Sequence, residues 1–394
     1  MDRLAHHQEI YNTLSSLGLK LYYSKSVMNH LVHIIDGMLT KGCSGTLTDL
    51  HQLSYHPKHR TTLSHFLHKG VWDENRLLQA AQQSVCKQIH RLAKQTNEPV
   101  FLMIDDTICQ KTKPSLQAKS PIEGCDHHFS HTEGKFVWGH QVVWMMIRCA
   151  HRAFPYAFAR YDKTSGISKI ALARQMIQSL HGWNHRVYVL FDSWYTSKSL
   201  IETCLTKGWY VIAALKTNRI LYPQGIRQSA KEFARYIDVS DTHLVTVGGE
   251  TYRVYRYEGA LNDIPNAVVL FCWKTDQPMT SEHLRCFLST DTELSDQAIL
   301  EYYAKRWSIE SYFRQTKETL GFDRYRIRHE RAIKRYWVIV QFTYIYCMTE
   351  HSSDFSTGLA SVRSRKIHNL IEFIYYEAQR GVPLDSIKKQ LRVA

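Results

Sequence analysis

Along residues 1–95, apolar positions recur at helical spacing. The segment SKSVMNHLVHIIDGML carries apolar residues three and four positions apart and ends near Gly42. A basic, His-rich turn, SYHPKHRTT, then precedes a long amphipathic stretch. This pattern predicts a helical N-terminal domain. Its basic character suits DNA binding, and a helical cap on the next domain explains the same pattern equally well.

At residue 96 the pattern changes to short apolar runs rich in β-branched and aromatic residues. Three such runs, EPVFLMIDDT, KFVWGHQVVWMMIRCA and RAFPYAFARYDK, come first, and helical and strand patterns then alternate as far as residue 216. The resulting order, β-β-β-α-β-α-β, predicts a mixed sheet with helices on its faces. Acids follow two of these strands, at Asp105 and Asp106 and at Asp192.

Strand patterns return in the next part of the chain, where Gly248-Gly249 between two strand-like arms predicts a hairpin. A helical segment then closes near Gly321, and two more helices are expected, roughly over 330–350 and 365–392. We divide the chain into a helical DNA-binding or cap domain (1–95), the first part of an α/β core (96–216), a β-rich insertion (217–290), the second part of the core (291–352) and a C-terminal helical segment (353–394).

The helical segment YYAKRWSIESYFRQTKETLG carries Tyr303, Arg306, Glu310 and Lys317 at spacings of 3, 4 and 7 residues. At about 100° per residue, these four side chains share one narrow stripe of a single helix. A solvated face more often scatters its charges in opposite-sign pairs one turn apart. This stripe instead places a carboxylate beside two cations and a phenol, which favours a site that handles both metal and phosphate. An apolar stripe runs beside it: Tyr302, Ile309, Phe313 and Leu320.

The composition of the chain indicates the charge of its partner. The 394 residues include 50 Lys and Arg against 36 Asp and Glu, giving a net charge of +14 and a pI near 9.3. This excess favours a polyanion, nucleic acid first and an anionic membrane surface second. The N-terminal stretch lacks the apolar core of a signal peptide, and the longest apolar run, YWVIVQFTYIYCM, is too short to span a bilayer. Nine cysteines include no C-x-x-C pair, so we expect reduced thiols in a soluble, cytoplasmic protein.

Three acids carry the candidate chemistry: Asp105 or its neighbour Asp106, then Asp192, then Glu310. Carboxylates that converge at strand ends can hold Mg²⁺, which prefers hard oxygen ligands. Two such ions can activate an attacking oxygen and stabilise the leaving oxygen in phosphodiester chemistry. Taken singly, each acid also has a structural explanation, as a helix cap, a turn residue or an i,i+4 partner.

Further polar and aromatic residues near these acids are candidates for DNA contacts. Lys111 and Lys113 follow the first acids and are expected to contact backbone phosphate. Trp194, close after Asp192, suits stacking along a DNA path and equally suits packing against the sheet. The segment CDHHFSH does not have the spacing of a paired zinc module, and we expect a polar or phosphate-facing loop there. His140 is expected to be structural.

Three stretches together resemble the insertion-sequence-4 family of DDE transposases. The string Tyr303-x2-Arg306-x3-Glu310-x6-Lys317 is similar to the family's signature. LFDSWYTSKSL resembles its second-aspartate block, and FLMIDDT resembles its first block, an apolar strand that leads into Asp and Thr. The resemblance covers roughly residues 100–350.

The resemblance implies an RNase H-like core interrupted by a β-insertion, two Mg²⁺ ions for which Mn²⁺ can substitute, and cut-and-paste transposition through hairpin ends. Asp105 or Asp106, Asp192 and Glu310 would then be the metal ligands. Contacts to DNA near the cut would come from the other signature residues, Tyr303, Arg306 and Lys317. Partners would be the transposon ends, target DNA and a second copy of the chain in the DNA complex.

One departure from the family pattern concerns the hairpin step. The family's hairpin pathway uses an aromatic residue near the end of the insertion to stabilise a flipped base, and around EHLRCFLST only Phe287 is present. Two alternatives to an active transposase are a nuclease of the same core that does not join strands and an inert DNA-binding descendant.

The choice between Asp105 and Asp106 depends on strand geometry. Alternate residues of a strand face opposite sides, so the two acids face opposite sides of the sheet. Asp105 gains from the Asp-x-Thr pattern with Thr107, in which the acid still lies on the strand and is rigidly placed. We therefore favour Asp105 and keep Asp106 as the alternative.

Overall fold

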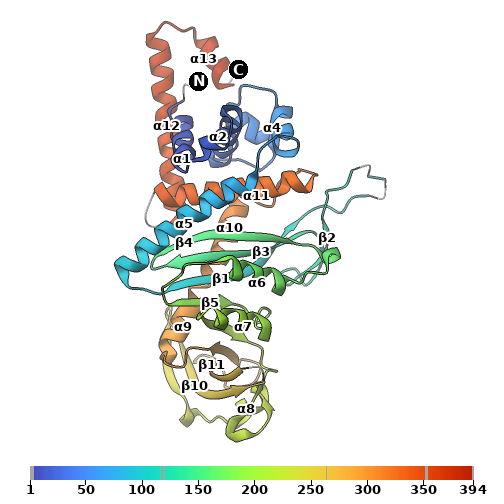
Figure 1. The fold of residues 1–394 in the computed structure, drawn as a ribbon, viewed down its shortest axis with the longest axis vertical. Coiled ribbons are helices and arrows are strands. Elements are labelled where there is room, and N and C mark those ends of the chain that lie inside the picture. The colour runs from blue at the N-terminus through green and yellow to red at the C-terminus, as the bar shows by residue number, and fades with distance from the viewer. Residues whose placement is uncertain (1–3, 116, 119, 263, 351–353, 393–394) are drawn as a thin grey trace.

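The computed structural model describes residues 4–115, 117–118, 120–262, 264–350 and 354–392. A large mixed sheet crosses the molecule, with the N-terminal helices at one end of the long axis and the last strands of the sheet at the other (Figure 1). This mixed α/β architecture is the fold class that the sequence predicts, and it is consistent with an RNase H-like core.

Helices make up the N-terminal part of the described chain, as predicted. Ser24 begins one of them, because its side chain accepts a hydrogen bond from the backbone N–H of Val27 and so satisfies one of the free donors at the helix start. The His-rich turn lies before α4. The helices are α1 (Ala5–Ser16), α2 (Lys25–Leu39), α3 (Leu47–Leu53), α4 (Arg60–His68) and α5 (Glu74–Thr96).

The core of the sheet is built around β1 (Val100–Gln110). This strand pairs antiparallel with β3 (Lys135–Cys149) on one side and parallel with β5 (Val187–Phe191) on the other. Its first five residues are fully buried, as expected for the apolar run of a strand covered on both faces. Its other core neighbours are β4 (Arg152–Tyr161), which pairs with β3, and β6 (Tyr210–Leu215), which pairs with β5.

The segment CDHHFSH forms a strand, β2 (Asp126–Ser130), where the sequence interpretation expected a loop. It pairs antiparallel with the start of β3. Phe129 and Phe136 face each other across this hairpin, with ring centroids 5.4 Å apart. Cross-strand aromatic pairs of this kind stabilise an antiparallel hairpin. The expectation was wrong because it weighed only the Cys and His spacing and not the aromatic pairing.

The strands of residues 217–290 continue the core sheet. Strand β12 (Arg285–Ser289) pairs antiparallel with β6, and the order along the sheet is β2-β3-β1-β5-β6-β12-β11-β10-β7-β8. The predicted hairpin is confirmed: Val247 pairs with Glu250 across Gly248 and Gly249, whose φ angles are +61° and +84°. The other strands are β7 (Ile220–Leu221), β8 (Gln228–Ser229), β9 (His243–Val247), β10 (Glu250–Leu261) and β11 (Ile264–Lys274).

The helix predicted to carry the signature residues is divided into α9 (Asp296–Ala304) and α10 (Trp307–Thr319). At the junction the backbone forms i→i+3 hydrogen bonds, from Lys305 N to Tyr302 O (3.1 Å) and from Arg306 N to Tyr303 O (3.0 Å). The chain therefore tightens by one turn of 3₁₀ type between the two helices. The single straight helix of the sequence interpretation was wrong, although Arg306 and Glu310 keep their one-turn spacing.

The C-terminal helices also differ from the expectation of one helix over 365–392. α12 (Phe355–Gln379) begins at Asp354, whose side chain accepts a hydrogen bond from the backbone N–H of Thr357. α13 (Leu384–Leu391) is separate, because Gly381 has a φ of +73° and Pro383 cannot continue a helix. The remaining helices are α6 (Lys169–Ser179), α7 (Lys198–Thr206), α8 (Ala230–Phe233) and α11 (Glu330–Glu350).

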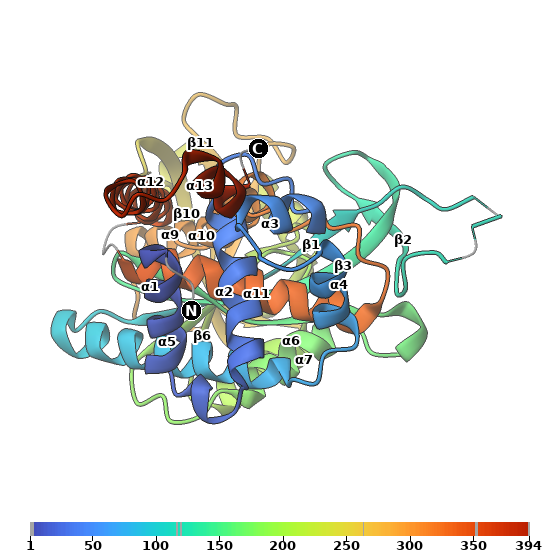
Figure 2. The same ribbon diagram turned by 90° about the horizontal axis from the view of Figure 1, so that it is seen from above.

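Helix α11 joins the N-terminal helices to the sheet. It contacts α2, α4 and α5 as well as β4, and it crosses beneath α2 when the molecule is seen from above (Figure 2). Arg335 of α11 is fully buried and pairs with Glu74 at 3.1 Å. Its guanidinium also donates to the backbone carbonyls of Phe66, Leu67 and Trp72. One buried cation thus holds the α4–α5 connection against α11.

We expect Arg335→Met to lower the free energy of unfolding by about 3–5 kcal/mol, because it leaves a buried carboxylate without its partner. Denaturant unfolding of the purified chain measures the loss. Lys334→Met is the matched control: Lys334 also approaches Glu74, at 3.6 Å, but its side chain is 45% exposed. That change should cost less than about 1 kcal/mol. Equal losses in the two variants would contradict the role of Arg335.

Candidate active site

Two neighbouring parallel strands end in acids at the same edge of the sheet. β1 and β5 pair in register up to Ile104 and Phe191, so Asp105 and Asp192 each follow the last pair. Residues in register on paired parallel strands point to the same face. Accordingly, the charge of Asp192 is close enough to raise the pKa of Asp105. Two apolar strand runs and their parallel pairing therefore place two carboxylates side by side.

Asp105 lies in a poorly hydrated position. Burial raises the pKa of its carboxyl to about 7, the guanidinium of Arg306 opposes that rise, and the charge of Asp192 adds to it. The carboxylate also accepts a hydrogen bond from the backbone N–H of Asp106 at 2.8 Å. A second cation near this group would favour its charged form.

Arg306 connects Asp105 with Glu310. Its Nη1 donates to Oδ2 of Asp105 at 3.0 Å, and its Nη2 donates to Oε1 of Glu310, four residues further along the chain. The junction between α9 and α10 places the guanidinium at the first turn of α10, against the end of β1. The structure thus brings Asp105, Asp192, Arg306 and Glu310 into one neighbourhood from two strands and a helix.

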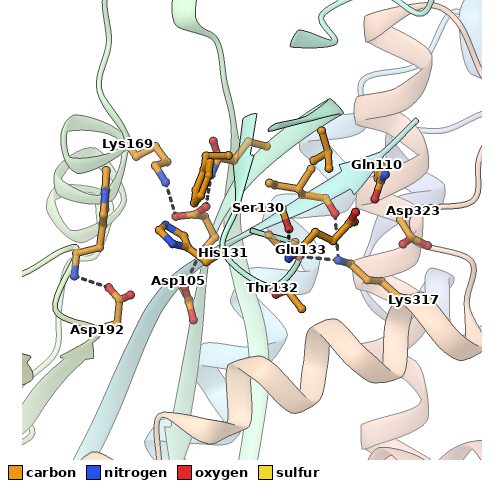
Figure 3. A pocket seen from close by; sticks show the side chains of 17 residues that line it. Asp105, Gln110, Ser130, His131, Thr132, Glu133, Lys169, Asp192, Lys317 and Asp323 are labelled. Atoms are coloured by element: carbon orange, nitrogen blue, oxygen red, sulfur yellow. Dashed lines mark hydrogen bonds and ion pairs between the residues drawn. The ribbon is translucent and has the colours of Figure 1, made fainter. Parts of the chain in front are cut away.

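Asp105, Asp106 and Asp192 open into a cleft of about 400 Å³, whose lining also includes Lys317. Glu310 and Arg306 are not part of that lining. In Figure 3, Asp105, Asp192 and Lys169 lie on one side of the view, and Lys317 and Asp323 lie on the other. The Lys317 ammonium donates to Oγ1 of Thr107 at 2.7 Å and to the carbonyl of Ile108 at 3.1 Å. Residues of the β2–β3 hairpin tip form another wall: Ser130, His131, Thr132 and Glu133.

Asp106 alternates with Asp105 along β1 but lines the same cleft, and it has partners of its own. Lys169 of α6 pairs with its Oδ1 at 2.9 Å, and the hydroxyl of Tyr195 donates to the same oxygen at 2.7 Å. Gln141 of β3 donates to Oδ2. The alternation of β1 therefore separates the two acids, as predicted, and Asp106 is held in a polar network rather than beside Arg306.

The segment after β5 orders Asp192. Its Oδ1 accepts hydrogen bonds from the backbone N–H groups of Trp194 (3.0 Å) and Tyr195 (3.2 Å). The Trp194 side chain is 38% exposed and lines the cleft, and the Lys169 ammonium lies 3.9 Å from its ring centroid. Asp192 thus caps its own turn, and this does not consume its second carboxylate oxygen.

The other predicted DNA-binding residues lie at different places. Tyr303 packs against Phe287, with ring centroids 4.8 Å apart, and both line a second cavity of about 600 Å³. The Arg306 guanidinium lies 5.7 Å from the Tyr303 ring centroid, so Tyr303 borders the acids as well as this cavity. The Lys111 ammonium donates to the backbone carbonyl of Asp323 and lies against the ring of Tyr325, and Lys111 does not line the cleft. Lys113 is exposed and lines neither cavity.

The three acids fit a hard divalent cation, because each of them offers carboxylate oxygens as ligands. Asp105 and Asp192 also follow neighbouring strands, so their oxygens approach from the same edge of the sheet. Arg306 lies between Asp105 and Glu310 in this conformation. Among the described residues, ligand atoms of three side chains lie within 4.8 Å of one another only at His6, His7 and Asp36. Binding by all three acids together would therefore require Glu310 to turn away from Arg306. The Glu310 side chain, 32% exposed, has room to do so.

Sequence reasoning missed Lys169 and Gln141 as neighbours of the acids. Gln141 had a usable signal, since it is a lone amide within the apolar run VWGHQVVWMM and is buried. A buried amide needs a partner, which here is Asp106. Lys169 had no such signal, because its position depends on how α6 packs on the sheet.

A pH dependence follows from the raised pKa of Asp105. Between its ordinary pKa of 3.8 and about 7, the folded chain binds a proton that the unfolded chain has released. The free energy of unfolding should therefore fall as pH rises through this window, by up to about 1.4 kcal/mol per pH unit. Asp105→Asn removes this term, so its stability profile should be flatter than that of the unaltered chain. Denaturation of both proteins in EDTA from pH 4 to about 8 tests this, and parallel profiles would count against it.

Comparison with known proteins supports one family. The family model described as the transposase DDE domain matches residues 97–346, from the start of β1 through most of α11. A search of curated proteins finds no match. No helix of the described residues combines the length and hydrophobicity needed to cross a membrane. The matched region contains both strand-end acids, Arg306, Glu310 and Lys317, and the chain belongs to the transposase DDE domain family.

Proposed function

We propose that this chain is a DNA transposase of the cut-and-paste type, with Asp105, Asp192 and Glu310 as its catalytic acids. The observation that carries the proposal is the meeting of Asp105, Asp192 and the Arg306–Glu310 pair within the family's domain. A transposase must cut DNA and join the freed end to new DNA. In both reactions negative charge develops on the oxygens of a phosphodiester. Metal-binding carboxylates and nearby cations can stabilise that charge.

We propose Mg²⁺ as the cofactor, as two ions with Mn²⁺ as a substitute, held by Asp105, Asp192 and Glu310. Bound divalent ions would supply an activated oxygen nucleophile and charge stabilisation for the leaving oxygen. The chain itself contributes the rigid placement of two of these acids, one on β1 and one at the end of β5. It also contributes the buried setting that makes Asp105 avid for positive charge.

The role of Arg306 follows from its two partners. Its guanidinium lies between Asp105 at the end of β1 and Glu310 in the first turn of α10, and pairs with both. If these acids were to hold a metal, the guanidinium would be free to bind a phosphate of the DNA strand, for which its planar fork is suited. Lys317, which faces the same cleft, and Tyr303 are proposed as further DNA contacts.

We favour Asp105 over Asp106 as the first ligand. Asp105 pairs directly with Arg306, which also holds Glu310, whereas the partners of Asp106 are Lys169, Tyr195 and Gln141, all of them outside the signature helix. The acid that one guanidinium already links to Glu310 is the better placed of the two to share a cation with it. Lys111, Lys113 and Trp194 remain proposed DNA contacts of the surrounding surface.

We also propose that the DNA ends pass through hairpins and that two copies of the chain act together on them. Phe287 supports the hairpin step, because it lies against Tyr303 near the end of the β-rich segment and is half-buried beside a cavity that could receive a base. The substrates would be the inverted-repeat ends of the element and its target DNA.

The first prediction concerns the ligands. Asp192→Ala and Glu310→Ala should abolish cleavage of labelled element ends while end binding and fold persist, because the metal is lost and the DNA surface is kept. Gel-based cleavage in Mg²⁺ and Mn²⁺, with binding measured in EDTA, reads this out. A variant that still cuts at a near-normal rate would exclude that residue as a ligand.

A second prediction separates the adjacent acids. Asp105→Asn should reduce cleavage as severely as Asp192→Ala, whereas Asp106→Asn should cost no more than roughly 10- to 100-fold, the usual effect of losing an outer partner. Both proteins should be shown to fold before their rates are compared. Loss of cleavage in the Asp106 variant alone would reverse the assignment.

Strand joining distinguishes a transposase from the rival activities. Purified chain, element ends and Mg²⁺ should yield excised ends that join to target DNA. Cleavage without joining would favour a nuclease of the same core, and binding with neither reaction would favour an inert descendant.

A further inference from the structure

A second cationic surface lies on the segment that connects α10 to α11. Burial alternates along it: Tyr325 and Ile327 are buried, whereas Arg324, Arg326 and Arg328 are exposed. This alternation places the three arginine side chains on the outer, solvent-facing side of the segment, while Tyr325 and Ile327 point inward.

The arginine segment is anchored from below. The hydroxyl of Tyr325 lies 2.7 Å from Nδ1 of His140, and its ring packs against Tyr336 and Trp337. The Lys111 ammonium lies 3.7 Å from the centroid of the same ring. At the far end, the backbone N–H of Glu123 donates to the carbonyl of Arg328 at 2.8 Å. A segment held at both ends and in the middle presents its cations with little ordering cost on binding.

These arginines line a groove of about 710 Å³ that adjoins the catalytic cleft. Gln110 and Asp323 line both cavities, so the groove continues from the cleft past the end of β1. Trp138 of β3 and Pro121 form part of the opposite lining. The cleft and the groove together can therefore hold a longer stretch of a bound polymer than the cleft alone.

The charge of this groove is strongly positive. Its lining holds Lys111 and the three arginines against one acid, Asp323. No ion pair within the described residues involves Arg324, Arg326 or Arg328, in contrast to Arg306, which is paired with two acids. Like charges held close together repel, so three arginines without acidic partners raise the free energy of the folded chain. A bound anion would offset that repulsion.

We infer that this groove binds the phosphodiester backbone of the DNA as it leaves the catalytic cleft, with Arg324, Arg326 and Arg328 on neighbouring phosphates. The inference rests on the proposed function, in that it takes DNA as the substrate of the cleft. Three successive outward arginines along one groove suit a polymer that carries several anions better than a single small anion, and continuity with the cleft gives the course of the strand. Arginine suits these contacts because its fork can bind a phosphate through two hydrogen bonds.

The test compares the unaltered chain with the triple variant Arg324→Gln, Arg326→Gln and Arg328→Gln. Binding to a random-sequence duplex of about 30 base pairs is measured by fluorescence anisotropy in EDTA at several salt concentrations. Each phosphate contact contributes about 0.9 to the slope of log affinity against log salt, so the triple variant should lose roughly 2–3 of that slope. Affinity at low salt should fall by at least about tenfold.

A matched control removes three exposed cations of the β-rich segment instead: Arg227→Gln, Lys231→Gln and Arg235→Gln. It changes net charge by the same amount and should leave the slope nearly unchanged. An equal loss of slope in both variants, or no loss in the groove variant, would overturn the inference. A groove variant that loses slope only on an RNA duplex of the same length would overturn it in favour of RNA.

The outcome is independent of catalysis, because binding is measured without metal. Asp192→Ala should keep the full salt slope while it loses cleavage. If the unaltered chain never cuts DNA but the groove variant loses slope, the proposed function fails and the groove stands. If the chain cuts and joins DNA but the groove variant keeps its slope, the groove fails and the function stands.

Discussion

The carboxyl groups of Asp105 and Asp192 come to the same edge of the sheet because two parallel strands end together there. Burial, and to a lesser extent the charge of Asp192, makes the ionised form of Asp105 costly, and much of the surrounding site can be understood as a response to that cost. Arg306 supplies a positive charge to Asp105 and shares it with Glu310. The same buried pair of acids that is costly without a cation is a favourable place for one. The arrangement therefore links the stability of the fold to the chemistry of the cleft.

The adjacent acid, Asp106, lines the same cleft but has its charge compensated by other residues. The carboxylate of Asp106 is paired with Lys169 of α6 and accepts hydrogen bonds from Tyr195, which follows β5, and from Gln141 of β3. Tyr195 also donates its backbone N–H to Asp192. Tyr195 thus contacts both Asp106 and Asp192, and helps to fix their positions in the cleft.

The larger framework carries the cleft on rigid elements. β1 is covered on both sides by paired strands, and the strands of the β-rich segment extend the same sheet through β6 and β12. Helix α11 then ties the N-terminal helices to the sheet through Arg335. Between α10 and α11 the chain passes along the cleft with three arginines outward, so the connection between two packed helices is also a charged surface beside the site.

By itself, the sequence determined the strand and helix types, the mixed sheet, the acids at strand ends and the one-turn pairing of Arg306 with Glu310, because periodicity and short-range spacing are local properties. It did not determine the strand β2, the junction between α9 and α10, or the partners of Asp106. Those depend on contacts between residues far apart in the chain, such as Gln141 with Asp106 across paired strands and Lys169 across the sheet face. Alternation along β1 separated Asp105 from Asp106, but only the packing of α6 on one face and α10 on the other decided which acid met which cation, since a strand pattern carries no information about what covers each of its faces.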